Sequence, residues 1–294
     1  MSNLLKDRGG TVYAVSPCIT RRKIMKKRLL PILCAALCLC LVVAALWGLF
    51  GKSNRGPVVI AIIDTGISTN AIPSENILEG KNYLDPSLST EDTYGHGTAV
   101  ASVILKHLPE AQFVPLVSNA YDNGKIKQVD NDTFAQMIRD AVDVYHCQII
   151  NLSIGLILDK PSIREAVEYA EQKNVLVVAS AGNDYATDGK FKYYPAGYDT
   201  VLAVGSVNKK ENAISEFSQR GEWVNIYACG EEVTIKTLSG NKRESEGTSY
   251  SAAKVTAYAG EILQESGKKL TAEELRQKII EKAKELPDGT KYIP

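Results

Sequence analysis

The run Val58-Val59-Ile60-Ala61-Ile62-Ile63 decides how this chain folds. All six residues are apolar and five of them are β-branched. A short continuous run of this kind is typical of a strand that is buried on both faces of a sheet. Similar runs recur further along the chain, at Phe113–Val117, Gln148–Leu152, Val175–Ala179 and Val201–Val204.

Helical patterns lie between these runs, at Gly97–Leu108, Thr133–Tyr145 and Ser162–Gln172. Alternation of buried strands with helices predicts an α/β fold, a doubly wound and mostly parallel sheet with helices on both faces. Two further helices are expected at about Ser249–Glu265 and Thr271–Lys284. The second has a capping-box start at Thr271.

The amino-terminal part of the chain has the charge pattern of a membrane anchor. Residues 1–28 hold eight Lys or Arg and one Asp, and the next 22 residues, Leu29 to Phe50, carry no charge. At about 1.5 Å per residue, a helix of this length reaches about 33 Å, enough for a hydrocarbon core of about 30 Å. The basic residues before the span predict a cytoplasmic amino terminus. The alternative is a cleaved signal peptide, with a secreted protein that begins near Leu46.

We therefore expect four parts: a basic cytoplasmic tail (1–28), one transmembrane signal-anchor (29–50), a linker (51–57) and a single extracytoplasmic domain (58–294). Met25 is an alternative start to Met1. Residues 29–294 have 26 basic and 33 acidic side chains, and this acidic balance argues against nucleic-acid binding. We expect a monomer.

Only two of the six cysteines, Cys147 and Cys229, lie in the expected globular part. Their number and spacing fit neither a metal site nor a disulfide framework. Two unpaired buried thiols are favoured over a single bridge.

Residues with useful chemistry occur at the expected ends of strands and starts of helices. Asp64 opens an Asp-Thr-Gly turn, His96 is central in Gly-His-Gly-Thr, Asn183 ends Ala-Gly-Asn, and Ser249 ends Gly-Thr-Ser. Functional groups gather at the carboxyl ends of parallel strands. Taken singly, each has an ordinary alternative: a turn residue, a structural histidine or a helix cap.

Taken together, these four motifs resemble those of the subtilisin family of serine proteases. They occur in the family's order, with 32 residues from Asp64 to His96 and 153 from His96 to Ser249. The resemblance implies that Ser249 is the nucleophile, His96 its base and Asp64 the residue that orients His96. It also implies that Asn183 belongs to the oxyanion hole. Ser153, Ile154 and Gly155 would bind the substrate backbone, and Lys125–Asp130 would supply the opposite edge.

The chain also departs from the family pattern. Tyr250 replaces the usual Met after the nucleophile, Ala253 replaces a Pro, and Leu156 replaces a Gly that helps shape the specificity pocket. The family's calcium loop is short here, so we expect no metal site and no cofactor. The stretch Asp130-Asn131-Asp132 reads as a cap for the helix that starts near Thr133. Only seven residues separate the anchor from the first strand, which leaves no room for the usual propeptide.

Two functions compete. The first is a membrane-anchored serine endopeptidase that processes exported peptides or proteins through an acyl-enzyme. The second is a catalytically weak or inactive relative that binds peptides at the membrane as a scaffold or sensor. The complete set of Asp64, His96, Ser249 and Asn183 favours the enzyme.

Overall fold

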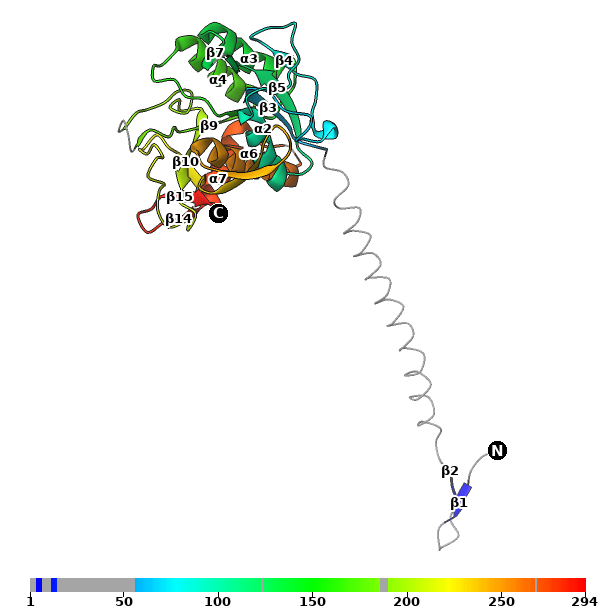
Figure 1. Ribbon diagram of the computed structural model, residues 1–294. Coiled ribbons are helices and arrows are strands. Elements are labelled where there is room, and N and C mark those ends of the chain that lie inside the picture. Colours follow the sequence, from blue (N-terminus) through cyan, green and yellow to red (C-terminus); the bar gives the residue numbers. More distant parts are fainter. Residues whose placement is uncertain (1–3, 7–11, 15–55, 123, 186–189, 268) are drawn as a thin grey trace. The chain divides into compact units, whose positions relative to one another are not determined.

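The computed structural model describes residues 4–6, 12–14, 56–122, 124–185, 190–267 and 269–294 (Figure 1). It divides into two units, Met1–Arg55 and Gly56–Pro294. In the first unit, β1 (Leu4–Lys6) pairs antiparallel with β2 (Val12–Ala14). The predicted anchor at 29–50 lies outside the described residues, and no helix within the described residues is long and apolar enough to cross a bilayer.

The second unit is built on a nine-stranded sheet in the order β14-β15-β11-β10-β9-β8-β3-β5-β4. The strands are β3 Val59–Asp64, β4 Lys81–Asn82, β5 Gln112–Val117, β8 Ile149–Leu152, β9 Leu176–Ser180, β10 Val201–Val207, β11 Ile226–Cys229, β14 Lys284–Glu285 and β15 Lys291–Ile293. Neighbouring strands are parallel, except that β14 runs antiparallel to β15. The prediction of a mostly parallel sheet is confirmed.

The sheet is doubly wound around β3. After β3 the chain forms β4 and β5 on one side and then returns to β8 on the other. The strand order therefore reverses at β3, and in open α/β sheets the crevice at such a reversal is the usual place for a functional site. Asp64 is the last residue of β3 and lies at this point.

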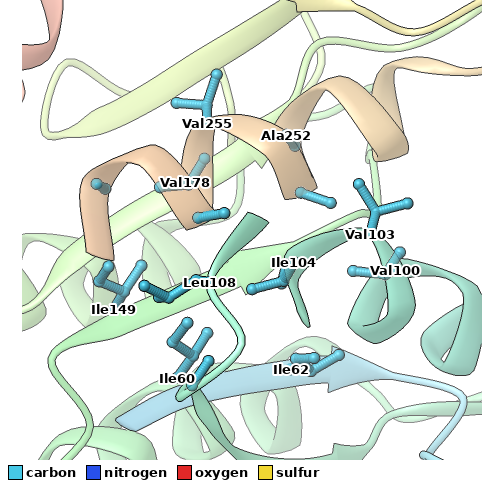
Figure 2. Close-up of a cluster of buried hydrophobic side chains, with 14 of the residues drawn as sticks. Ile60, Ile62, Val100, Val103, Ile104, Leu108, Ile149, Val178, Ala252 and Val255 are labelled. Atoms are coloured by element: carbon cyan, nitrogen blue, oxygen red, sulfur yellow. The ribbon is translucent and has the colours of Figure 1, made fainter. Parts of the chain in front are cut away.

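Helices cover both faces of the sheet, as predicted. Along β3, Ile60 and Ile62 pack in one apolar cluster with α2 (His96–His107), α6 (Thr248–Glu265) and α7 (Ala272–Glu281). Ala61 and Ile63 pack in a second cluster with α3 (Asn131–Asp143) and α4 (Pro161–Gln172). Figure 2 shows Ile60 and Ile62 beneath the side chains of α2 and α6. Because successive residues of a strand point to opposite faces, both faces of β3 are apolar.

Smaller elements flank the sheet. A 3₁₀ turn, η1, spans Ser74–Asn76. Two antiparallel hairpins lie outside the main sheet: β6 (Asn119–Asp122) with β7 (Lys125–Gln128), and β12 (Val233–Lys236) with β13 (Lys242–Ser245). The second hairpin comes directly before Gly-Thr-Ser and α6.

Four strands were missed, and two expected helix bounds need correction. The four strands nearest the sheet's two ends (β4, β11, β14 and β15) were not predicted. The last helix, α7, ends at Glu281 instead of Lys284, because Lys284 pairs with Tyr292 in β14. Helix α3 begins at Asn131, two residues early, since the Asp130 side chain accepts a hydrogen bond from the Thr133 N–H at 2.7 Å.

The two globular cysteines behave as predicted. Cys147 and Cys229 are free and buried, so the alternative of a bridge between them is wrong. Burial raises the pKa of the Cys147 thiol to about 12, which makes it a poor nucleophile at neutral pH.

Candidate active site

At the carboxyl end of β3, the His96 Nδ1 makes a bifurcated contact with both carboxylate oxygens of Asp64. The His96 Nδ1 lies 2.8 Å from Oδ1 and 2.9 Å from Oδ2 of Asp64. The Asp64 carboxylate accepts hydrogen bonds, so this contact places a proton on Nδ1. Nε2 of the neutral ring is then free to accept a proton.

Two opposing effects set the pKa of His96. Burial of the ring lowers it, whereas the nearby Asp64 carboxylate and the more distant Asp92 charge raise it. The net result is a raised pKa, because the charges outweigh the desolvation. The site therefore favours the imidazolium that forms whenever His96 takes a proton.

Glycine is required beside the pair. A Cβ added to Gly97 would lie 2.3 Å from the Gly66 carbonyl oxygen and 3.2 Å from the Asp64 Cβ. Without a side chain, α2 starts close against β3, and the Gly97 N–H donates to the Thr65 hydroxyl at 2.9 Å. This close approach explains the glycine after His96 in the Gly-His-Gly-Thr motif.

A second buried carboxylate, Asp92, holds the loop that carries His96. Its Oδ1 accepts from the N–H groups of Tyr94 and Gly95 at 2.9 and 2.7 Å. Its Oδ2 accepts from the Thr98 N–H at 2.9 Å and from the Thr98 hydroxyl at 2.6 Å. The Asp92 carboxylate thus accepts four hydrogen bonds, from residues that precede and follow His96 in the sequence. Asp92 was not among the residues predicted from the sequence. The pattern that could have indicated it is an Asp whose side chain can accept hydrogen bonds from backbone N–H groups two and three residues later.

Ser249 is the second residue of α6, beside the same crevice. It is buried, and the ring of the next residue, Tyr250, lies 6.3 Å from the His96 ring between centroids. Within the described residues no hydrogen bond joins Ser249 to His96; the hydrogen bonds of catalytic groups are often long before substrate binds. The structure therefore brings Tyr250, the residue after Ser249, close to His96, while a direct link from Ser249 to the pair is not seen in the described residues.

Asn183 is fixed through Thr248, the residue before Ser249. Its Oδ1 accepts from the Thr248 N–H at 2.9 Å and from the Thr248 hydroxyl at 2.8 Å. The hydroxyl in turn accepts from the Gly182 N–H at 3.2 Å. Since the amide oxygen is engaged, the Nδ2 group at the other end of the amide remains available as a donor.

The predicted substrate-binding edge follows β8. Ser153 and Ile154 are half-buried and Gly155 is exposed, and the Asn151 amide donates to the Ser153 hydroxyl at 3.2 Å. Ile154 and Val129 line one small cavity of about 20 Å³. The two predicted edges, Ser153–Gly155 and Lys125–Asp130, therefore flank the same cavity.

A larger pocket of about 520 Å³ opens beside His96. His96 and Tyr250 form one wall, and the β12–β13 hairpin forms the other. Nothing in the sequence pattern indicated this pocket.

No metal centre is evident in the described residues, which contain no group of three or more His, Cys, Asp or Glu side chains arranged to hold an ion. The short loop between α2 and β5 and the Asp130 cap contribute none.

Comparisons with known proteins identify the family. Residues 55–292 match the sequence profile of peptidase S8, the Subtilase family. The major intracellular serine protease of Bacillus subtilis (strain 168) is 32% identical over 228 residues, 71% of this chain and 69% of that protein. The minor extracellular protease Epr of the same organism is 32% identical over 246 residues, 80% of this chain. The matched region spans only 36% of Epr.

Solved structures give the same fold. A cold-adapted subtilisin-like serine proteinase superposes with a TM-score of 0.71 at 24% identity, covering 82% of this chain and 89% of that one. A lanthipeptide protease superposes with a TM-score of 0.65 at 25% identity, covering 76% and 79%.

Proposed function

Because the chain belongs to the subtilase family of subtilisin-like serine peptidases, we propose that it is a serine endopeptidase with Ser249 as nucleophile, His96 as base and Asp64 as orienting residue. The bifurcated contact of His96 Nδ1 with the Asp64 carboxylate is the observation that carries the proposal. It selects the tautomer in which Nε2 accepts a proton, as this chemistry requires.

Each step follows from these groups. His96 Nε2 removes the hydroxyl proton as Ser249 Oγ bonds to the substrate carbonyl carbon. The resulting oxyanion accepts from the Asn183 Nδ2 group and the Ser249 N–H. As the carbon–nitrogen bond breaks, His96 gives its proton to the leaving amine. Water, deprotonated by His96, then hydrolyses the acyl-enzyme and regenerates the Ser249 hydroxyl.

The substrate is a peptide or protein in an extended conformation. The backbone of Ser153–Gly155 would pair with residues before the scissile bond, and the exposed β7 strand would pair from the other side. Their shared cavity is too small, at about 20 Å³, for a large side chain without rearrangement.

The location and biological role are also proposed here. Residues 1–28 are basic and 29–50 uncharged, which supports a single-pass anchor with residues 58–294 outside the cytoplasm. Likeness to a lanthipeptide protease supports the processing of an exported peptide. Protease accessibility of residues 58–294 on intact cells, compared with permeabilised cells, tests the topology. A mature amino terminus near Leu46 would show secretion instead.

The competing function is a weak or inactive peptide-binding scaffold. The residues after Ser249 that depart from the family pattern, among them the buried Tyr250, favour it. A fluorophosphonate that modifies activated serines separates the two functions. Labelling of the wild-type chain that disappears in Ser249→Ala supports the enzyme. A folded wild-type chain that stays unlabelled supports the scaffold.

A further inference from the structure

The pocket between His96 and the β12–β13 hairpin carries positive charge. Arg243 of β13 and Lys236 of β12 both line it, and no lining residue within the described part of the chain is acidic. The Lys236 ammonium donates to the Ala71 carbonyl oxygen at 2.8 Å, a neutral partner that leaves its charge uncompensated. Among the described residues, no ion pair or hydrogen bond engages the Arg243 guanidinium.

The register of the hairpin directs Arg243 into this pocket. Arg243 pairs with Ile235 across the two strands, and both line the pocket. Its neighbour Lys242 does not line this pocket. Lys242 lines an adjoining hollow with Ser102 and Lys106, and the two hollows share Ile235 and Lys236. Arg243 is exposed, so it is accessible to a substrate.

The pocket lies on the leaving-group side of the proposed reaction. It begins at His96, which protonates the leaving amine, and at Tyr250, the residue after the nucleophile. None of Ser153, Ile154 and Gly155, which would hold residues before the scissile bond, lines it. With Ser153–Gly155 assigned to the residues before the scissile bond, the pocket beside His96 is left for the residues after it.

We infer that this pocket binds an acidic side chain, Asp or Glu, within the first three substrate residues after the scissile bond, and that Arg243 sets this preference. The inference rests on the proposed peptidase function. The pocket volume of about 520 Å³ falls within the range of about 300–1,000 Å³ typical of sites for small ligands. Arg is suited to the role because its planar guanidinium binds a carboxylate through two parallel hydrogen bonds.

The test compares quenched fluorescent peptides that share one sequence up to the scissile bond. They carry Glu, Gln or Lys at each of the next three positions in turn, and the full chain is used. We expect kcat/KM for the best Glu peptide to exceed that for its Lys counterpart about tenfold, with Gln between them. In Arg243→Glu the order of Glu and Lys should reverse. The preference should weaken at about 1 M salt, where the screening length is about 3 Å.

Lys242→Glu is the matched control, since it makes the same charge change one residue away, at a side chain that does not line the pocket. It should leave the order of the peptides unchanged. Equal kcat/KM for Glu and Lys peptides, or equal effects of the two variants, would overturn the inference.

Binding of the same peptides to Ser249→Ala, followed by fluorescence anisotropy, separates this inference from the proposed function. Tighter binding of the Glu peptide without any wild-type turnover supports a pocket that binds an acidic side chain and refutes the peptidase. Turnover without a charge preference refutes the pocket and leaves the peptidase standing.

Discussion

The oxygen of the Asn183 side chain accepts two hydrogen bonds from Thr248, one from its N–H and one from its hydroxyl. The residue before the nucleophile thereby fixes which end of the Asn183 amide faces the crevice. Asn183 is exposed and would otherwise rotate freely. The geometry of Gly-Thr-Ser and that of Ala-Gly-Asn are thus one unit, although 65 residues separate Asn183 from Thr248.

This unit predicts how Asn183 variants behave. Asn183→Asp keeps an oxygen that accepts from Thr248 but lacks the Nδ2 donor. We expect kcat to fall about 10²–10³-fold, the range known for the oxyanion amide of subtilisin itself, with KM nearly unchanged. Steady-state kinetics on one peptide measures this.

Thr248→Val completes the comparison. It retains the backbone N–H but loses the hydroxyl that accepts from Gly182 and donates to Asn183. We expect a smaller fall in kcat, about tenfold, because the amide is less well oriented but still able to donate. A fall as large as that of Asn183→Asp would contradict this ranking.

The raised pKa of His96 predicts opposite trends of activity and stability with pH. Catalysis needs neutral His96, so kcat/KM should rise through an apparent pKa above the ordinary value of about 6.5. The folded state binds this proton more tightly than the unfolded state. The pairing with Asp64 therefore contributes its full stability below about pH 6.5 and loses it as the pH rises through the folded pKa.

Asp64→Asn tests the cause of the shift. Without the carboxylate, the desolvation of His96 is no longer offset as strongly, so the apparent pKa in the pH–rate profile should fall below that of the wild type. The rate should fall about 10⁴-fold, because the amide no longer selects the productive tautomer. The melting temperature of the variant relative to the wild type, followed from pH 5 to 9, should be lowest at acid pH.

Asp92 is expected to stabilise the loop around His96. Asp92→Asn replaces one of two acceptor oxygens with a donor that faces N–H or O–H groups. We expect the free energy of unfolding to fall by about 3 kcal/mol and kcat to fall with it. Asp85→Asn is the control. Asp85 also accepts a hydrogen bond from a backbone N–H, that of Ser87, but it is exposed. The urea midpoint of the Asp85→Asn variant should therefore hardly change.

The sequence predicted the centre of this fold better than its edges. Strands such as β3 are buried on both faces, so their residue types are dictated by burial alone. At the sheet's far end, β14 is only two residues long and both are exposed; its structure depends on pairing with β15, which no local pattern shows. The helix pattern of α7 therefore continued past its true end at Glu281.

Some residues of the candidate site could likewise be predicted from the sequence, and others could not. Asp64, His96, Asn183 and Ser249 were predictable because each belongs to a short motif beside a buried strand or helix. The role of Arg243 was not, since it depends on the register of β13 against β12 and on the hairpin's placement against α2. Residue type alone would make Arg243 an ordinary surface cation.

Ile62 packs on the face of β3 that is covered by α2 and α6. Ile62 is fully buried between the sheet and α2 (Figure 2), and Ile62→Ala should lower the free energy of unfolding by about 3 kcal/mol, because it removes apolar contacts and leaves a cavity. Ile126→Ala makes the same chemical change in β7, where the side chain is 63% exposed, and should cost less than about 0.5 kcal/mol. Urea unfolding of both variants measures the difference. Equal losses of stability would mean that Ile62 does not occupy the core position that organises the sheet.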